Sequence, residues 1–337
     1  MSLSTPLPAP RPHIWIVILA CSILCSCSPG IIAQEPPLDT SAQLSDTRFI
    51  TRDGSELPVK KWLPVGAVEG VLIAVHGFND YSNFIKDGAP YFNEHRLAVY
   101  AYDQRGFGET KTRGRWTSRK ALTDDLATFI RLIQAAYPDT PLYVLGDSMG
   151  GAVTIATMVI NKPERVNGII LVAPAVWART EMPLYQRFAL WLSAHTVPWM
   201  KVSGKSLDIV ASDNIEMLRD LGRDPLVIKE SRIEALYGLS NLMDEAYSLA
   251  EELHCKTLLL YGQKDEIIPR TPVSTFYERL PGRADGRQQL ILYENGYHML
   301  LRDSQADVVL HDIVDWITNQ ASTVTDTSQP AGSITRN

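Results

Sequence analysis

Basic clusters are missing from this chain of 337 residues, which carries 32 Lys and Arg against 38 Asp and Glu and has a net charge of −6. A nucleic-acid-binding surface needs a patch or stripe of Lys and Arg to neutralise phosphates. Since the sequence has no such run, we expect no nucleic-acid partner. It also has no internal repeat, and its 45% of hydrophobic residues is typical of a globular protein with a sizeable core.

Cysteine is scarce, with four residues in all. Cys21, Cys25 and Cys27 close an apolar run near the N-terminus, and Cys255 stands alone in the body of the chain. Cys255 has no stable partner, so we expect a fold without disulfides. No histidine pair accompanies the three close cysteines, and their segment is apolar, so we expect no metal site there.

The longest apolar run covers residues 14–27, too short to span a bilayer as a helix and of the right length for a signal-peptide core. We expect residues 1–27 to be an export leader and residues 28–45, rich in Pro, Ser and Gln, to be a tether. Small residues before cysteine resemble a bacterial lipoprotein signal, with Cys27 as the favoured lipidation site. Cleavage after Ala33 and an uncleaved anchor are the alternatives. The protein would then be a membrane-associated lipoprotein, or periplasmic or secreted.

The body alternates continuous apolar runs with helical patterns, which indicates an α/β fold whose parallel strands are buried on both faces. An antiparallel hairpin of residues 47–51 and 57–62 comes first. The strands expected after it cover residues 71–75, 97–102, 142–145, 166–172, 257–261 and 289–293. The helical patterns between and after them cover residues 118–136, 152–160, 272–280 and 304–317.

The alternation stops between residues 177 and 254, where helical stretches follow one another with no strand. A parallel sheet interrupted once in this way is the pattern of an α/β-hydrolase with a helical cap. We expect the hydrolase domain to cover residues 46–319. Residues 320–337, rich in Ser and Thr and without large apolar groups, are expected to be a disordered tail.

The segment 142–151 carries the motif G-x-S-x-G between an expected strand and an expected helix. This is the context of a nucleophile elbow, in which the serine is strained and exposed at the sheet edge. Side chains at positions 146 and 150 would collide with the crossing helix and the neighbouring strand. The motif predicts Ser148 as a nucleophile.

A serine hydroxyl needs a base to take its proton and a carboxylate to orient that base. His298 and Asp265 each follow the end of an expected strand, at the sheet edge where Ser148 would lie. Glu266 is the alternative to Asp265. The backbone N–H groups of Met149 and Phe78 are the expected oxyanion donors. This chemistry requires no cofactor and no metal.

Five motifs together resemble the monoacylglycerol lipase/lysophospholipase group of serine aminopeptidase-like hydrolases, over residues 45 to 319. The resemblance implies an α/β-hydrolase with Ser148, Asp265 and His298 as its triad, Phe78 and Met149 as oxyanion donors, and a cap over the site. Two positions depart from the group, with Asp147 where His or Glu is commoner and Asn79-Asp80 in place of Gly-Glu. The motifs begin at His76, Asp103, Gly146, Gly262 and Gly296.

The cap sequence places large apolar groups at helical spacing from Leu184 to His195, among them Phe188 and Trp191. We expect most of this stripe to pack the cap onto the body. The density of apolar groups also suggests an acyl-chain tunnel, with Phe188 and Trp191 as candidate substrate-binding residues.

The favoured function is a serine hydrolase that cleaves carboxylic esters of single-chain lipids, monoacylglycerols or lysophospholipids, through an acyl-enzyme. Its partner is a small acyl ester, with membrane association through the leader or its lipid. A small-ester carboxylesterase is one alternative. A prolyl-type aminopeptidase is another, and would need cap carboxylates such as Glu181, Glu216 or Glu245. A non-catalytic binding protein on the same scaffold is a third, which the intact triad disfavours.

Overall fold

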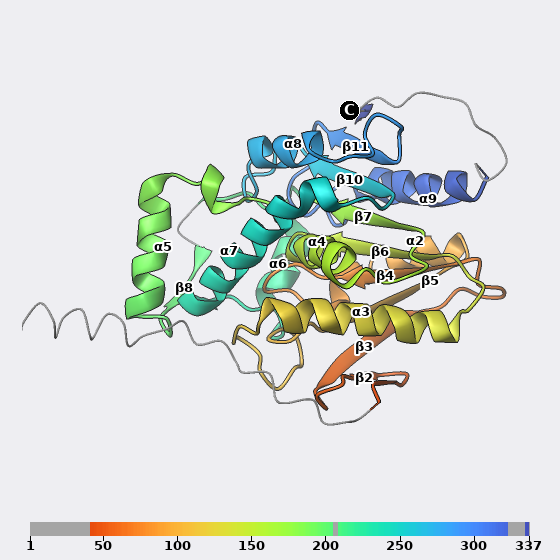
Figure 1. Ribbon diagram of the computed structural model, residues 1–337, viewed down its shortest axis with the longest axis horizontal. Helices are drawn as coiled ribbons and strands as arrows, with labels where there is room; N and C mark the ends of the chain where they lie inside the picture. The colour runs from red at the N-terminus through yellow and green to blue at the C-terminus, as the bar shows by residue number, and fades with distance from the viewer. Residues whose placement is uncertain (1–40, 205–207, 323–333, 337) are drawn as a thin grey trace, which may run out of the picture.

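A computed structural model describes residues 41–204, 208–322 and 334–336 of the chain. The predicted leader, its cysteines and most of the predicted tether lie outside these residues. Within them, one mixed sheet forms the centre of the molecule (Figure 1). From edge to edge its strands are β1 (Gln43–Leu44), β2 (Arg48–Ile50), β3 (Glu56–Trp62), β5 (Leu97–Tyr102), β4 (Gly70–Val75), β6 (Leu142–Asp147), β7 (Gly168–Val172), β10 (Thr257–Gly262), β11 (Gln288–Tyr293) and β12 (Ile334–Arg336).

The strands pair as the apolar runs predict. β5, β4, β6, β7, β10 and β11 are parallel neighbours, and their residues are almost all buried because helices cover both faces of the sheet. β2 and β3 form the predicted antiparallel hairpin, and β3 joins the parallel strands through β5. The α/β class and the mostly parallel central sheet are therefore confirmed.

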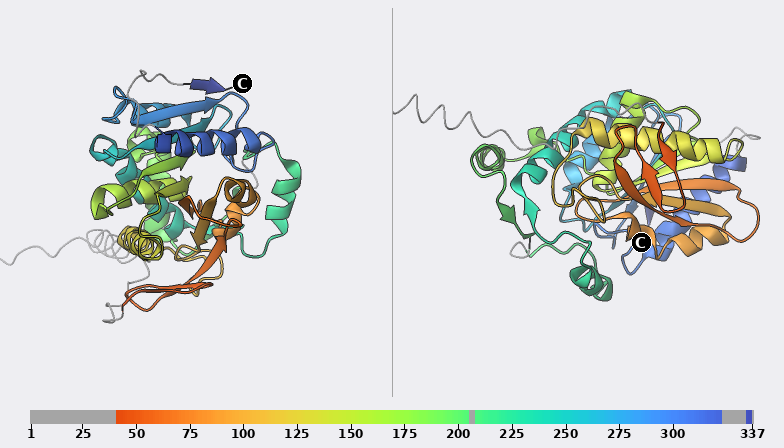
Figure 2. Two further views of the ribbon diagram at one scale, coloured as in Figure 1. Left: turned by 90° about the vertical axis from the view of Figure 1, so that its right-hand side faces the viewer. Right: turned by 90° about the horizontal axis from the view of Figure 1, so that it is seen from below.

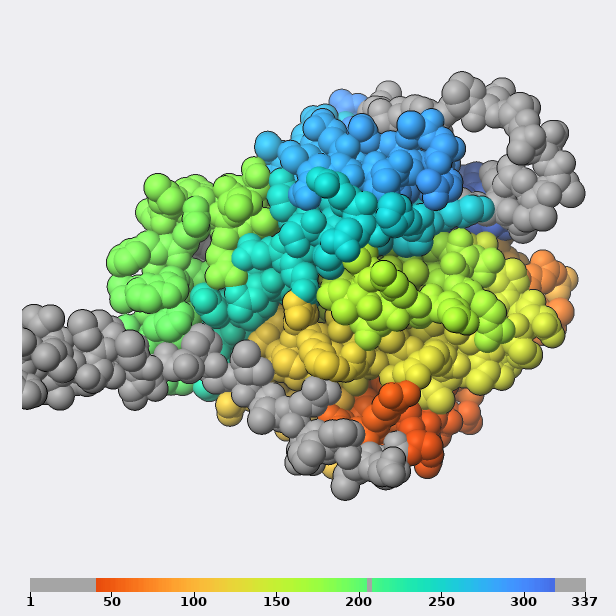
Figure 3. Space-filling model, in the orientation of Figure 1, coloured from red at the N-terminus to blue at the C-terminus, as the bar shows by residue number. Residues whose placement is uncertain are grey.

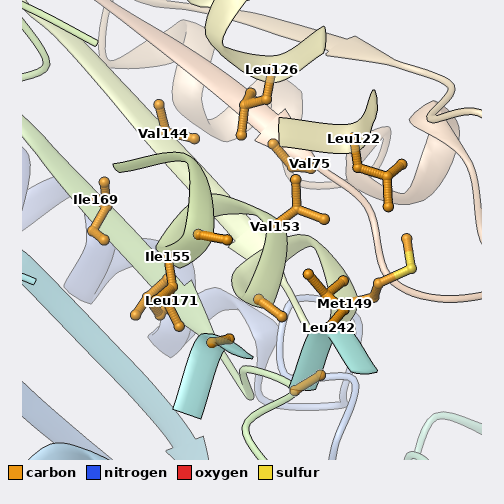
Figure 4. Close-up of a cluster of buried hydrophobic side chains, with 14 of the residues drawn as sticks. Val75, Leu122, Leu126, Val144, Met149, Val153, Ile155, Ile169, Leu171 and Leu242 are labelled. Carbon is orange, nitrogen blue, oxygen red and sulfur yellow. The ribbon is translucent and has the colours of Figure 1, made fainter. Parts of the chain in front are cut away.

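Helices cover the sheet on two faces. One layer contains α3 (Arg119–Ala136), α4 (Met149–Ala156), α7 (Ile233–Ser248) and α8 (Arg270–Glu278), whose apolar side chains form one core with the strands (Figure 4). The opposite layer contains α2 (Ala89–Glu94) and α9 (Ala306–Ser322) over a second core. α3 begins where predicted because the Ser118 hydroxyl accepts the N–H of Ala121 at 3.0 Å.

The cap lies between β7 and β10 and has two arms. The first contains α5 (Leu184–Thr196), which stands apart from the sheet, and the second contains α6 (Ile215–Arg223) on another side of the body (Figures 1 and 2). We expected no strand in the cap, and this prediction is wrong. β8 (Lys201–Val202) and β9 (Ser231–Arg232) pair antiparallel and hold the ends of the two arms together.

The described ends of the chain differ from expectation in two places. α9 extends through Ser322, and residues 334–336 pair with β11 as an added parallel strand, although the sequence suggested disorder from residue 320. The remaining tail residues lie outside the described part. Within residues 41–204, 208–322 and 334–336, no helix is both long and apolar enough to cross a membrane.

Candidate active site

Ser148 occupies the turn between β6 and α4 with φ 50° and ψ −112°. A positive φ is uncommon outside glycine and persists only where the surroundings enforce it. Here the N–H of Ser148 donates to the Val172 carbonyl of β7 at 2.9 Å, and its own carbonyl accepts the N–H groups of Gly151 and Ala175. The strained backbone predicted for the elbow serine is confirmed.

The two glycines of the motif are required by close backbone contacts. A Cβ on Gly146 would lie 2.5 Å from the carbonyl oxygen of Gly150 in α4, and a Cβ on Gly150 would lie 2.0 Å from that of Val75 in β4. Both obstacles are backbone atoms inside regular elements, so neither can move aside cheaply. This confirms the prediction that side chains at positions 146 and 150 would collide with the crossing helix and the neighbouring strand.

His298 and Asp265 come together with Ser148 at the carboxyl edge of the sheet. His298 Nε2 lies 3.0 Å from Ser148 Oγ, and His298 Nδ1 lies 2.7 Å from Asp265 Oδ2. The carboxylate can only accept, so Nδ1 carries the proton and Nε2 is free to accept the serine proton. The geometry is that of a nucleophile, a base and an orienting acid.

Asp265 is held by backbone groups of its own loop. Its Oδ1 accepts the N–H groups of Ile267 and Ile268 at 2.8 and 2.9 Å, which leaves Oδ2 facing His298. Glu266, the alternative acid, instead accepts the N–H of Val210 from the cap at 2.7 Å. The structure therefore places Asp265, and not Glu266, beside the histidine.

Neighbouring carboxylates favour the charged form of His298. Burial alone would lower its pKa, but the charge and hydrogen bond of Asp265, together with the charges of Asp147 and Asp303, raise the pKa above that of an ordinary histidine. Burial also raises the pKa of Asp147 to about 6, against the opposing charges of Arg302 and His298. Asp147 directly precedes Ser148 and its charge acts on His298, so the position where the sequence departs from the group it resembles contributes to the electrostatics of the site.

The predicted oxyanion donors lie on the two segments that meet at Ser148. Met149 begins α4, where first-turn N–H groups lack partners within the helix. Phe78 follows Gly77, where an added Cβ would lie 3.3 Å from that of Ser148, so this loop passes directly over the nucleophile. His76 fixes the loop: its Nδ1 lies 2.8 Å from the Gly77 carbonyl, and its Nε2 accepts the N–H of Gln104 at 2.9 Å.

The sequence did not predict a buried ion pair that lies beside the site. Arg302 donates to Asp80 at 2.6 Å, and both side chains are less than one-tenth exposed. The other Asp80 oxygen accepts the N–H of Tyr81 at 2.8 Å. Asp80 was visible as one of the departures from the resembling group, but nothing in the sequence pairs it with a residue 222 positions away.

The apolar stripe of the cap does not pack onto the body, so the expectation that most of it would do so is wrong. Phe188 is 62% exposed, Trp191 47% and Leu184 76%, and α5 projects from the body (Figure 3). Ala194 is the one buried residue of α5. The helix is held mainly by its contact with α7, where the His195 ring packs edge-on against Tyr237.

One cavity of about 430 Å³ lies beside the second cap arm and not at the nucleophile. Its lining is largely polar and includes Asp80, Arg302, Asn214 and Glu216, and it contains neither Phe188 nor Trp191. This cavity does not correspond to the acyl tunnel that the sequence suggested.

The cap carboxylates considered for an aminopeptidase have other partners or positions. Glu245 pairs with Arg119, Glu181 accepts the Tyr247 hydroxyl at 3.2 Å, and Glu216 lines the cavity beside the second arm. None of these contacts directs a carboxylate to Ser148.

Comparison with known protein families gives a match over most of the body. The family described as serine aminopeptidase, S33, matches residues 66–305. A protein of Rattus norvegicus named monoglyceride lipase is 24% identical over 278 residues, covering 81% of this chain and 90% of that protein. A monoacylglycerol lipase of Mycolicibacterium smegmatis is 26% identical over 282 residues, covering 82% and 98%.

Solved structures share the fold. A soluble variant of monoglyceride lipase from Saccharomyces cerevisiae, in complex with a substrate analogue, superposes with a TM-score of 0.69 at 18% identity, covering 87% of this chain and 98% of that one. The monoacylglycerol lipase of Paleococcus ferrophilus superposes with a TM-score of 0.65 at 22% identity, covering 79% and 99%.

Proposed function

Since this chain belongs to the serine aminopeptidase S33 family of α/β-hydrolases, we propose that it is a serine hydrolase whose substrates are monoacylglycerols and other single-chain lipid esters. Its relatives named monoglyceride lipase support a carboxylic ester hydrolase. The observation that carries the chemistry is the hydrogen-bonded series from Asp265 through His298 to the strained Ser148.

The reaction proceeds through an acyl-enzyme. Ser148 Oγ attacks the ester carbonyl carbon while its proton passes to His298 Nε2. The carbonyl oxygen becomes an oxyanion that accepts the N–H groups of Phe78 and Met149. The carbon–oxygen bond to the glycerol breaks, and His298 gives its proton to the departing alkoxide. Water then attacks the acyl carbon and loses its proton to His298. The bond between that carbon and Ser148 Oγ breaks, His298 returns the proton to Ser148 Oγ, and the fatty acid leaves.

The exposed face of α5 supports a substrate that comes from a lipid surface. Within α5 the sequence carries no Asp or Glu, and the aromatic rings of Tyr185, Phe188 and Trp191 are exposed. Phe and Trp insert well into the boundary of a bilayer, and the charges of Arg187 and Lys201 suit anionic lipid headgroups. We therefore propose that α5 lies on the membrane, where Phe188 and Trp191 contact the acyl chain as it enters.

A substrate panel tests the reaction class. Purified protein should hydrolyse monoacylglycerols and p-nitrophenyl esters, with little activity on emulsified triacylglycerol and none on amino-acid anilides. Ser148→Ala should abolish all of these activities. Preferred cleavage of the anilides would instead favour the aminopeptidase, and a purely acetyl or butyryl preference would favour a small-ester carboxylesterase.

Vesicle sedimentation tests the role of α5 separately from the leader. A chain beginning at residue 41 should bind vesicles of three parts phosphatidylcholine and one part phosphatidylglycerol. Replacing Phe188 and Trp191 by Ser removes two apolar groups worth roughly 1.5 kcal/mol each, so partitioning should fall about 100-fold. Val65→Ser, which removes a fully exposed apolar group in the turn after β3, is the matched control. Equal binding by all variants would refute membrane contact through α5.

The apolar run of residues 14–27 and the cysteine at its end support a location outside the cytoplasm. We propose that the protein is exported and attached to a membrane through lipid on Cys27. Cys27→Ser should leave an unprocessed or mislocalised precursor, whereas Cys21→Ser should be processed normally. A soluble wild-type product that begins at Gln34 would contradict lipidation and support plain cleavage.

A further inference from the structure

The loop that carries His298 is held by a buried contact with the cap. The Tyr297 N–H donates to Asp303 Oδ2 at 2.7 Å, and the Ser212 hydroxyl donates to Asp303 Oδ1 at 2.5 Å. On the other side of the histidine, the Met299 N–H donates to the Ala211 carbonyl at 3.1 Å. Both sequence neighbours of His298 are therefore held, one through Asp303 and one directly by the cap.

Further hydrogen bonds join the same two segments. The Asn214 side chain donates to the Arg302 carbonyl at 3.0 Å, and the Ser304 N–H donates to Asp213 at 2.8 Å. Asn214 also accepts the N–H of Met217 as the N-cap of α6. Residues 211–214, at the root of the second cap arm, are thus bound to the histidine loop along its length.

The Asp303 carboxylate is a buried hydrogen-bond acceptor. Its side chain is buried, and Ser212 is fully buried. A carboxylate is costly to bury unless both of its oxygens are hydrogen-bonded, and here each oxygen accepts one strong donor. One of those donors is the N–H of Tyr297, the residue before His298, so the carboxylate fixes the backbone one residue ahead of the imidazole.

We infer that Asp303 and Ser212 are positioning residues for His298, through which the root of the second cap arm sets the geometry of the base. This rests on the proposed function, because it assigns these residues a part in the reaction at Ser148. The contacts of His298 with Ser148 and Asp265 require placement to within about half an ångström, and a displacement of 1 Å can cost about 100-fold in rate.

Esters too small to reach the cap distinguish positioning of His298 from binding of the acyl chain. If the cap acted only by binding the acyl chain, changes at its root would not affect an ester too small to reach it. Because residues 211–214 hold the base, the same changes should slow every substrate in the acylation step. The rate with p-nitrophenyl acetate therefore separates positioning from substrate binding.

The test compares Asp303→Asn and Ser212→Ala in the full chain. With p-nitrophenyl acetate, kcat should fall about 10- to 100-fold in Asp303→Asn and several-fold in Ser212→Ala, with KM within about two-fold of wild type. Labelling of Ser148 by a fluorophosphonate should slow in parallel. The double variant should lose little more than the stronger single variant, since both changes act on the same contact between Asp303 and Ser212. Asp307→Asn, at an exposed position in the first turn of α9, should leave kcat unchanged.

The pH dependence of kcat/KM is a second measurement. It would not change if Asp303 only stabilised the fold. The negative charge of Asp303 favours protonated His298, so in Asp303→Asn the inflection of kcat/KM should move to lower pH. Asp303 faces Ser212 and Asp213 from the cap and His298 and Tyr297 from its own loop.

The outcomes are distinct. Wild-type kcat in both variants, together with a wild-type pH inflection in Asp303→Asn, would overturn the inference while leaving the proposed function intact. A loss confined to long-chain esters, or to KM, would also overturn it, because the cap would then act by binding alone. If Asp303→Asn does not fold, Ser212→Ala decides by its kcat with p-nitrophenyl acetate. Failure of the wild type itself to hydrolyse esters would instead refute the proposed function.

Discussion

Replacing Asp265 by Asn should invert the tautomer of His298. Asp265 Oδ1 accepts two backbone N–H groups, from Ile267 and Ile268, so the amide oxygen of an asparagine will occupy that side. Its NH₂ group then faces His298 Nδ1, which must accept instead of donate. The proton moves to Nε2, and Nε2 can no longer take the proton of Ser148.

The expected magnitude follows from losing the base while keeping the shape of the site. A triad with the wrong tautomer loses about 10⁴ in kcat, which corresponds to about 5.4 kcal/mol of transition-state stabilisation. The assay is steady-state hydrolysis of p-nitrophenyl butyrate, with the melting temperature measured alongside it. The melting temperature should change little, because the two backbone hydrogen bonds are retained.

Glu266→Gln is the matched control for Asp265→Asn. Its amide oxygen can still accept the N–H of Val210, so kcat should stay within about two-fold of wild type. A large loss in Glu266→Gln together with near-normal activity in Asp265→Asn would refute the assignment of the acid and the tautomer argument with it.

Three further predictions concern pH, packing and a buried charge. kcat/KM should rise with pH through an inflection above 6.5, because neutral His298 is the active form and its pKa is raised; an inflection below about 6 in the pH–rate profile would contradict this electrostatic argument. Gly150→Ala should lower the free energy of unfolding by about 3 kcal/mol or more in denaturant titrations, whereas Gly222→Ala, in α6 with open space around it, should raise it by about 0.5–1 kcal/mol; similar values for the two would refute the collision with β4. Arg105→Met should lower the free energy of unfolding by about 3–5 kcal/mol, because it leaves Asp53 and Asp125 buried without their shared partner. The exposed Arg223→Met should lower it by less than about 1 kcal/mol. Equal losses in the two variants would refute the importance of the buried ion pairs of Arg105.

The sheet and the elbow could be predicted because their signals are local. Continuous apolar runs identify strands buried on both faces, and Gly146 and Gly150 report backbone contacts that no other residue tolerates. Ser148, Asp265 and His298 could be placed together because loops at the ends of parallel strands share one edge of the sheet.

The cap and the surroundings of the triad could not be predicted in the same way. An apolar helical stripe has the same spacing whether it faces a core or solvent, and α5 turned out to be exposed. Asp303 lies close to His298 in sequence, but its partner Ser212 is 91 positions away, and no local pattern links them. The short strands β8 and β9 consist of two residues each, below the length at which alternation is visible.

The most direct test of the central claim is to map the site of acylation. Wild-type protein should react with a fluorophosphonate probe at Ser148 alone, as located by peptide mass spectrometry, and lose hydrolysis of monoacylglycerol in proportion to labelling. Ser148→Ala should show neither labelling nor hydrolysis. Labelling of a different serine, or monoacylglycerol hydrolysis that survives in Ser148→Ala, would contradict the account.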